Sequence, residues 1–221
     1  ELMDNDKNVI TLVAGDVSGD PEIDYKWLHE NTNSSGFLVS GNHIVYNDKD
    51  KTIQDLQQEE RDLFAKSDRW QYMEKDYKVF DNEKIVIFGS TLWTDFELTS
   101  KDPTWGMLMA KQSTNDFRWG LMKDENGVVS GLRPQWCLEE HKKTLEALDN
   151  VCKEYPDYSI VVLTHHCPSA NSIPQEYSHY GNNCAYASHL EEFITDHNET
   201  INRKRGKVMI LVMDIGNTNI K

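Results

Sequence analysis

Polar side chains that could hold a divalent cation stand at three points of the chain, each directly after an apolar run. They are Asp16, Asn42, His43, His165 and His166. If those runs are strands of an open α/β sheet, their carboxyl ends meet where ligands bind. Oxygen ligands suit hard cations, and imidazole suits Mn, Fe and Zn. A lone Gly-Asp is more typical of a turn, and a lone histidine of the core, so the prediction of a metal site rests on the combination.

The elements that would position these residues can be read from the pattern of apolar residues. Apolar, β-branched runs, typical of strands buried on both faces, occur at 9–14, 36–39, 84–88, 159–163 and 208–213. Stretches with helical spacing fall between them, at 21–30, 52–65, 135–153 and 187–196. Strands alternating with helices predict an α/β fold in a single domain over residues 1–221. Residues 97–134 show no clear period, and we interpret them as a cap or insertion over a cleft.

Composition limits the classes of partner. The 221 residues are 38% hydrophobic and include six Trp, as expected of a globular chain with a full core. Lys and Arg number 23 against 37 Asp and Glu, giving a net charge of −14. Such a surface repels polyanions, which disfavours non-specific nucleic-acid binding and docking on anionic lipid. A local site that holds cations could still bind a small phosphate ester.

Cellular context is indicated by what the sequence lacks. The longest apolar run, 208–213, is far shorter than the roughly 20 residues of a membrane span. The acidic N-terminus lacks the basic and apolar regions of a signal peptide. The four cysteines form no Cys-x-x-Cys pair and are typical of reduced thiols. The sequence therefore predicts a cytoplasmic protein that does not insert in a membrane, and it carries no signal for oligomeric state.

Three stretches resemble successive signature motifs of the calcineurin-like metallophosphoesterases. Residues 13–16 read Val-Ala-Gly-Asp, 39–43 read Val-Ser-Gly-Asn-His, and 162–169 read Val-Leu-Thr-His-His-Cys-Pro-Ser. Further segments resemble small bacterial and phage members of that family, namely 89–96, 115–118 and 183–188.

The resemblance implies a four-layer αββα sandwich of the metallophosphoesterase type, with two divalent metals (Mn, Fe, Zn or Mg) at the strand ends. By this analogy Asp16 bridges the metals, and Asn42 and His165 bind one of them. His43 would contact the phosphate and protonate the leaving oxygen, while His166 would orient a ligand or touch substrate. Two cations of this kind clamp a phosphoryl group and lower the pKa of a bridging water.

Two further residues are candidates for substrate binding. The planar guanidinium of Arg118 suits phosphate oxygens, with a surface salt bridge as the alternative. Trp93 could line the cleft or belong to the core. The remaining histidines lie in polar stretches and are expected to be solvated; they are His29, His141, His179, His189 and His197.

The sequence departs from the family pattern at both ends. No Asp-x-His precedes Asp16, so that motif is expected upstream of Glu1 or has been lost. The closing Gly-His-x-His is replaced by Gly216-Asn217-Thr218-Asn219, and Ile44 stands where the family has an acid. Asn217 and Asn219 could bind a metal through their amide oxygens, more weakly than imidazole does. These departures predict a single weak metal site in this chain rather than a complete pair.

The C-terminal stretch 214–221 carries a second resemblance, to the first phosphate-binding motif of the acetate- and sugar-kinase superfamily, especially pantothenate kinases of the third type. In those proteins the motif opens the fold, whereas here it closes the chain. We interpret it as a coincidence or a junction.

These observations lead to two hypotheses. The first is a metal-dependent phosphoesterase that hydrolyses a phosphomonoester or phosphodiester of a small molecule by attack of a metal-bound hydroxide. The alternative is a catalytically degenerate binding or scaffold protein of the same fold, since both closing histidines have become asparagine.

Overall fold

The computed structural model describes residues 9–46, 50–202 and 208–212, which form a mixed α/β fold. Its strands are β1 (Ile10–Val13), β2 (Ser35–Leu38), β3 (Trp70–Tyr72), β4 (Asp76–Phe80), β5 (Ile85–Ser90), β6 (Leu121–Lys123), β7 (Val129–Gly131), β8 (Ser159–Thr164) and β9 (Val208–Val212). Its helices are α1 (Pro21–Asn31), α2 (Ile53–Phe64), α3 (Pro103–Ser113), α4 (Asp116–Trp119), α5 (Pro134–Glu154) and α6 (Glu191–Asn202).

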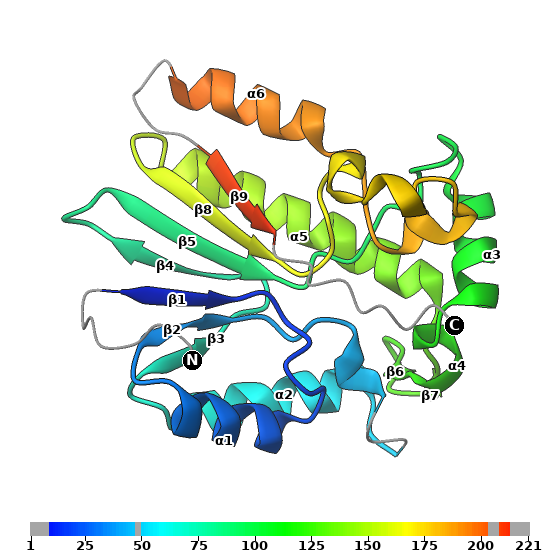
Figure 1. Ribbon diagram of the computed structural model, residues 1–221, viewed down its shortest axis with the longest axis horizontal. Coiled ribbons are helices and arrows are strands. Elements are labelled where there is room, and N and C mark those ends of the chain that lie inside the picture. The colour runs from blue at the N-terminus through cyan, green and yellow to red at the C-terminus, as the bar shows by residue number, and fades with distance from the viewer. Residues whose placement is uncertain (1–8, 47–49, 203–207, 213–221) are drawn as a thin grey trace.

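The first sheet has three parallel strands in the order β1-β2-β3. Helices α1 and α2 lie against it (Figure 1). Leu28 and Phe64 of these helices pack with Leu38, Trp70 and Tyr72 of the sheet. Burial of these large apolar side chains fixes both helices on the sheet, because each contributes roughly 1.5–3 kcal/mol.

Local signals in the sequence explain where these two helices begin. The Asp20 side chain accepts hydrogen bonds from the backbone N–H groups of Glu22 and Ile23, as a helix cap does. Thr52 and Asp55 form a reciprocal capping box at the start of α2. Each helix therefore starts a few residues after a strand end or loop that contributes to the candidate site.

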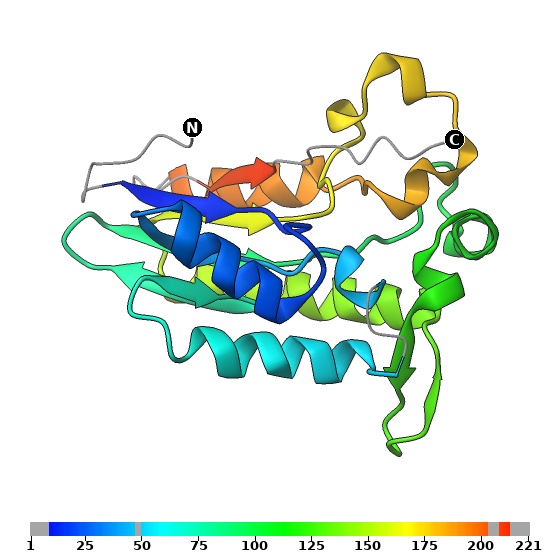
Figure 2. The same ribbon diagram turned by 60° about the horizontal axis from the view of Figure 1, so that its bottom comes forward.

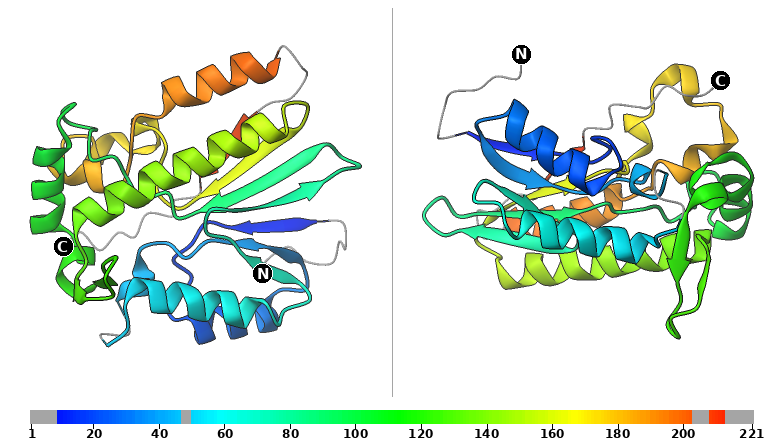
Figure 3. Two further views of the ribbon diagram at one scale, coloured as in Figure 1. Left: turned by 180° about the vertical axis from the view of Figure 1, so that it is seen from behind. Right: turned by 90° about the horizontal axis from the view of Figure 1, so that it is seen from below.

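The second sheet has the order β4-β5-β8-β9, with only β4 antiparallel to its neighbour. Side chains alternate between its faces, because successive residues of a strand point to opposite sides. Val86 and Phe88 pack toward Leu148 of α5, whereas Ile87 faces the other way. Figure 3, seen from behind, shows α5 lying across this sheet. Burial on both faces accounts for the continuous apolar runs of β5 and β8.

A third hydrophobic cluster joins the two sheets. Phe37 and Met73 from the first sheet and its edge pack with Ile87, Val161 and Leu163 of the second. The parallel strands of both sheets point toward the end where α3 and α4 lie (Figure 1). The loops after β1, β2 and β8 are therefore brought to one end of the molecule.

The segment 97–134 contains α3, α4 and the β6–β7 hairpin, which projects from the body in Figure 2. Ala110, Met122 and Leu132 join a buried cluster with Ile44 and Phe96, beside the loops at the strand ends. The segment thus has its own packing onto the end of the fold that carries the predicted site residues.

The sequence-based elements compare closely with the structure where apolar runs are long. The five predicted strands correspond to β1, β2, β5, β8 and β9, and three predicted helices to α1, α2 and α5. The fourth helix begins at Glu191 rather than at 187, because Ala187 pairs with Cys167 and Ser188 N–H donates to the Cys167 carbonyl. The elements not predicted are β3, β4, β6, β7, α3 and α4.

The structure bears on two features of the sequence, the state of the cysteines and the length of the apolar helices. All four cysteines are buried, and none of them forms a disulfide. Among the described helices, none combines the length and the apolar character needed to cross a membrane.

A buried carboxyl anchors the loop that follows β2. Glu60 of α2 is 1% exposed and accepts a hydrogen bond from the Ser40 hydroxyl, which also lies 2.9 Å from the Tyr72 hydroxyl. Burial raises the pKa of Glu60 to about 8, so this carboxyl is protonated at neutral pH. Ser40 is thereby held in place immediately before Gly41.

This anchor predicts a specific pH dependence of stability. The folded state retains a proton on Glu60 that the unfolded chain releases above the ordinary glutamate pKa of 4.5, so stability falls as pH rises toward 8. Between pH 6.5 and 8 we expect a loss of about 1.5 kcal/mol in the wild type, measured by urea denaturation. Glu60→Gln should show a flatter profile over that range. Parallel profiles for the two proteins would contradict an ionisable Glu60 in the core.

Candidate active site

Three strand ends converge on Asp16. The Asp16 N–H donates to the Ser40 carbonyl over 2.9 Å, joining the loop after β1 to the loop after β2. Asp16 has a φ of 55°, in the left-handed region that non-glycine residues seldom occupy. His165, the first residue after β8, lies against the same loops. The structure thus brings together residues from distant parts of the chain, as the parallel topology requires.

Two glycines permit this approach of backbones. Both Gly15 and Gly41 have positive φ, 91° and 80° respectively. A Cβ on Gly15 would lie 2.7 Å from the Gly41 nitrogen and 2.9 Å from His165 Nδ1. A Cβ on Gly41 would overlap the Asp16 carboxylate and lie 2.8 Å from its backbone nitrogen. A larger residue at Gly41 would therefore displace Asp16, and one at Gly15 would push against Gly41 and His165.

The Asp16 carboxylate faces two imidazoles. One oxygen, Oδ1, accepts from the His43 backbone N–H over 3.0 Å. The other, Oδ2, lies 3.5 Å from His43 Nε2 and 3.4 Å from His165 Nε2. The side chains of Asp16 and His43 are 19% and 23% exposed, so a small solute can reach them. The arrangement offers an acceptor and two groups that can carry a proton within one small volume.

The hydrogen bonds of His165 assign its protons. Nδ1 lies 2.7 Å from the Ala14 carbonyl oxygen, which can only accept, so Nδ1 carries a proton. Nε2 then faces two oxygens, Asn42 Oδ1 at 2.9 Å and Asp16 Oδ2 at 3.4 Å. Nε2 is therefore the ring atom that faces the oxygens of Asn42 and Asp16.

The amide of Asn42 is oriented by Asp116. Asn42 Nδ2 donates to Asp116 Oδ1 over 2.7 Å, and the Tyr46 hydroxyl donates to the same oxygen over 2.6 Å. Burial and the neighbouring Asp116 raise the pKa of Tyr46, so its phenol stays protonated and donates. Asp116 is 3% exposed, and desolvation raises its pKa in turn. The amide oxygen of Asn42 is thereby turned toward His165.

Sequence reasoning does not identify Asp116 as a site residue. Within the stretch 115–118 it indicates only Arg118. Nothing in an isolated Asp two residues before an Arg shows that it will meet an asparagine 74 positions earlier. The sequence separation of Asp116 and Asn42 does not indicate this contact, because the contact depends on where α4 packs.

His166 lies behind these residues and is held from the second sheet. Its backbone N–H and Nδ1 lie 3.1 and 3.2 Å from the Thr91 carbonyl oxygen. Thr91 is itself fixed by the buried Glu74 carboxylate, which accepts from its N–H and its hydroxyl. Burial lowers the pKa of His166 to about 3, so this imidazole is neutral. A neutral, 4% exposed ring suits an orienting role better than contact with substrate.

The other predicted residues are placed as follows. Trp93 is 4% exposed and stacks on His166, which places it in the core rather than at a surface. Arg118 is exposed on α4, two residues after Asp116. Asn217 and Asn219 lie outside the described residues. His141, expected to be solvated, is instead 2% exposed, because its Nδ1 contacts the Leu92 carbonyl from within α5.

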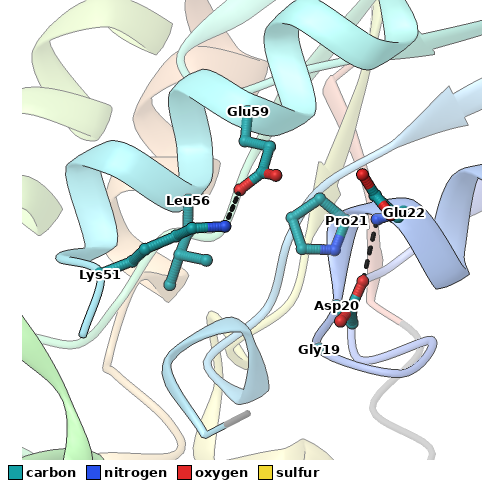
Figure 4. Close-up of a pocket in the computed structure, with 7 residues that line it drawn as sticks. All are labelled: Gly19, Asp20, Pro21, Glu22, Lys51, Leu56 and Glu59. Carbon is teal, nitrogen blue, oxygen red and sulfur yellow. Dashed lines mark hydrogen bonds and ion pairs between the residues drawn. The ribbon is translucent and has the colours of Figure 1, made fainter. Parts of the chain in front are cut away.

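A hollow of about 220 Å³ opens beside the loop that carries Asp16. It is lined by Gly19, Asp20, Pro21, Glu22, Lys51, Leu56 and Glu59 (Figure 4). Lys51 pairs with Glu59 at 2.8 Å, and Asp20 caps α1. These charged groups are thus engaged within the protein, and none of the predicted site residues lines the hollow.

Metal-ligand chemistry is limited among the described residues. They contain no group of three or more His, Cys, Asp or Glu side chains arranged to hold a metal ion. The Asp16, Asn42 and His165 set has one amide among its three donors. Its three donor atoms, Asp16 Oδ2, Asn42 Oδ1 and His165 Nε2, lie together on one side of the His165 ring, and a second set of this kind is not found among the described residues.

Comparisons with known proteins bear on the fold. No family model matches the sequence, and no curated protein matches it. The fold is similar to the crystal structure of phosphopantetheinyl hydrolase from Mycobacterium tuberculosis, with a TM-score of 0.62 and 13% identity. The match covers 97% of this chain and 76% of that one. At this identity the likeness concerns the fold.

These findings overturn the predicted membership of the calcineurin-like metallophosphoesterases. No family model supports it, and the similar structure is named a phosphopantetheinyl hydrolase. The motifs that carried the resemblance are short, and they contain the glycines and polar residues that any tight turn after a strand favours. Their geometry around Asp16 is a property of the structure and does not depend on that family.

The close approach of the loops predicts that Gly41 tolerates no side chain. Gly127 is a matched control, because its φ of 78° is similar and a Cβ there would meet nothing within 4 Å. We expect Gly127→Ala to cost about 1 kcal/mol for its backbone conformation alone. Gly41→Ala should cost about 1–3 kcal/mol more, through overlap with Asp16, in urea denaturation. Equal losses in the two variants would refute the tight packing of the loops.

Proposed function

We propose that this protein is a hydrolase of phosphate esters whose reaction centre is the group of Asp16, Asn42, His43 and His165. The observation that carries the proposal is the Asp16 carboxylate placed 3.4–3.5 Å from two imidazoles at a solvent-accessible strand end. The similar structure is a hydrolase by name, which supports this reaction class.

His43 is the proposed proton donor. Its backbone N–H is fixed by Asp16 Oδ1, and its ring is the more exposed of the two imidazoles that face this carboxylate. In hydrolysis a water oxygen bonds to phosphorus while the bond from phosphorus to the ester oxygen breaks. His43 would give a proton to that leaving oxygen, while the attacking water loses one proton to solvent. Asp16, whose Oδ2 lies 3.5 Å from His43 Nε2, would keep the imidazole in position.

Asp16, Asn42 and His165 are the proposed ligands of one divalent cation, of the Mn, Fe, Zn or Mg class. The support is His165 Nε2, which faces two oxygens although Nδ1 already carries the proton. A cation bound there would withdraw charge from the phosphoryl oxygens and lower the pKa of a water. A second cation, with Asn217 or Asn219 as ligands, remains a prediction.

The surrounding elements have proposed roles as well. We take the two sheets, with α1 and α2 on one outer side and α5 and α6 on the other, as a four-layer αββα arrangement. The three hydrophobic clusters between successive elements support it. We take 97–134 as a cap within a single domain, because Asp116 of α4 fixes the orientation of Asn42. Arg118 on the same short helix is a candidate contact for the phosphate.

Replacement of His43 should remove turnover while leaving the fold intact. We expect His43→Ala to lower the rate of hydrolysis of an aryl phosphate, with Mn²⁺ present, by about 10²- to 10⁴-fold, the range for loss of a general acid. Asp16→Ala should abolish turnover as well. His179→Ala is the control, because His179 is exposed and belongs to no part of the proposed centre.

Two outcomes would count against the proposal. Equal rates for wild type, His43→Ala and Asp16→Ala would show that any hydrolysis arises elsewhere. A wild type with no hydrolysis of monoesters or diesters, with or without Mn²⁺, would favour the alternative of a binding or scaffold protein.

A further inference from the structure

A series of aromatic rings leads outward from the proposed proton donor. The rings of His43 and Tyr46 have centroids 4.4 Å apart with planes at 35°. Tyr46 in turn meets Trp119 edge to face, at 5.3 Å and 86°. The series therefore runs from the reaction centre to the last residue of α4 within the length of two ring contacts.

The hydrogen bonds of Asp116 hold this series in place. Tyr46 donates its hydroxyl to Asp116 at the start of α4, and Trp119 stands at the end of the same four-residue helix. Asp116 also fixes Asn42, so the rings and the polar centre share one anchor. A flat surface held this rigidly loses little conformational entropy when a ligand stacks on it.

The outer end of the series is exposed. Trp119 is 39% exposed, whereas Trp70 and Trp93 are 2% and 4% exposed in the core. Arg118, the preceding residue of α4, is also exposed. An exposed indole that is joined by ring contacts to the reaction centre suits a ligand that carries both a flat ring and a phosphate.

We infer that the substrate is a phosphate ester that carries a flat aromatic ring, of the nucleoside monophosphate type, with its ring stacked on Trp119. This inference rests on the proposed function for the position of the phosphate. The net charge of −14 disfavours a long polyanion, so a mononucleotide fits better than a nucleic-acid strand.

The test compares two ligands that differ in the ring. Binding of adenosine 5′-monophosphate and of ribose 5-phosphate is measured by calorimetry with Mn²⁺ present, in protein that carries His43→Ala so that turnover does not interfere. We expect this protein to bind the nucleotide at least tenfold more tightly than ribose 5-phosphate, since stacking of one base contributes about 1–3 kcal/mol. Trp119→Leu should remove this preference while leaving the affinity for ribose 5-phosphate unchanged.

Trp105→Leu is the matched control, because Trp105 is a 57% exposed indole on another helix, α3. It should keep the preference for the ring. Equal affinities for the two ligands, no detectable binding of either, or equal losses in both tryptophan variants would overturn the inference. Circular dichroism of Trp119→Leu confirms that a loss reflects the ring and not unfolding.

The same two esters separate this inference from the proposed function. Phosphate release from both esters is measured with the wild-type protein and Mn²⁺. A ring preference in binding without any phosphate release would contradict the hydrolase and support the ring site. Release from both esters at equal rates, with no ring preference, would support the hydrolase and overturn the ring site.

Discussion

The position of the Asp16 carboxylate is the constraint on which the candidate site depends. It lies between two imidazoles because its backbone adopts a φ of 55° and bonds to Ser40, against a Gly41 that has no side chain. That conformation is costly for a non-glycine residue and persists only when its surroundings impose it. The parallel strands β1, β2 and β8 impose it by ending at the same place. An unusual backbone in this location indicates a function more strongly than the presence of the residue types alone.

Buried carboxyl groups hold the residues around Asp16 in place by hydrogen bonds. Glu60 accepts a hydrogen bond from Ser40, and Asp116 accepts one from Asn42. Glu74 accepts one from Thr91, whose carbonyl contacts His166. Each of these carboxyl groups is at most 5% exposed and is hydrogen-bonded, as buried polar groups must be. Such networks specify one arrangement, because breaking any bond leaves an unsatisfied group in a medium of low dielectric. The reaction centre is small, but its geometry is set by three separate parts of the core.

The sequence predicted those parts of the fold that depend on local pattern. Long apolar runs identified β1, β2, β5, β8 and β9, and the polar residues after three of them proved to be neighbours. Short strands such as β3 and β6 have only three residues, too few to show a period. Asp116 and the burial of His141 depend on how α4 and α5 pack, and no local pattern reports that. The family assignment was wrong because short turn motifs recur in unrelated chains.

The central claim is that Asp16, Asn42 and His165 form one centre that holds a cation beside His43. Calorimetric titration with Mn²⁺ tests it most directly, in the wild type and in His165→Ala. We expect one Mn²⁺ per chain in the wild type and at least tenfold weaker binding in the variant. Absence of Mn²⁺ binding in both proteins, or equal affinity in both, would contradict the claim.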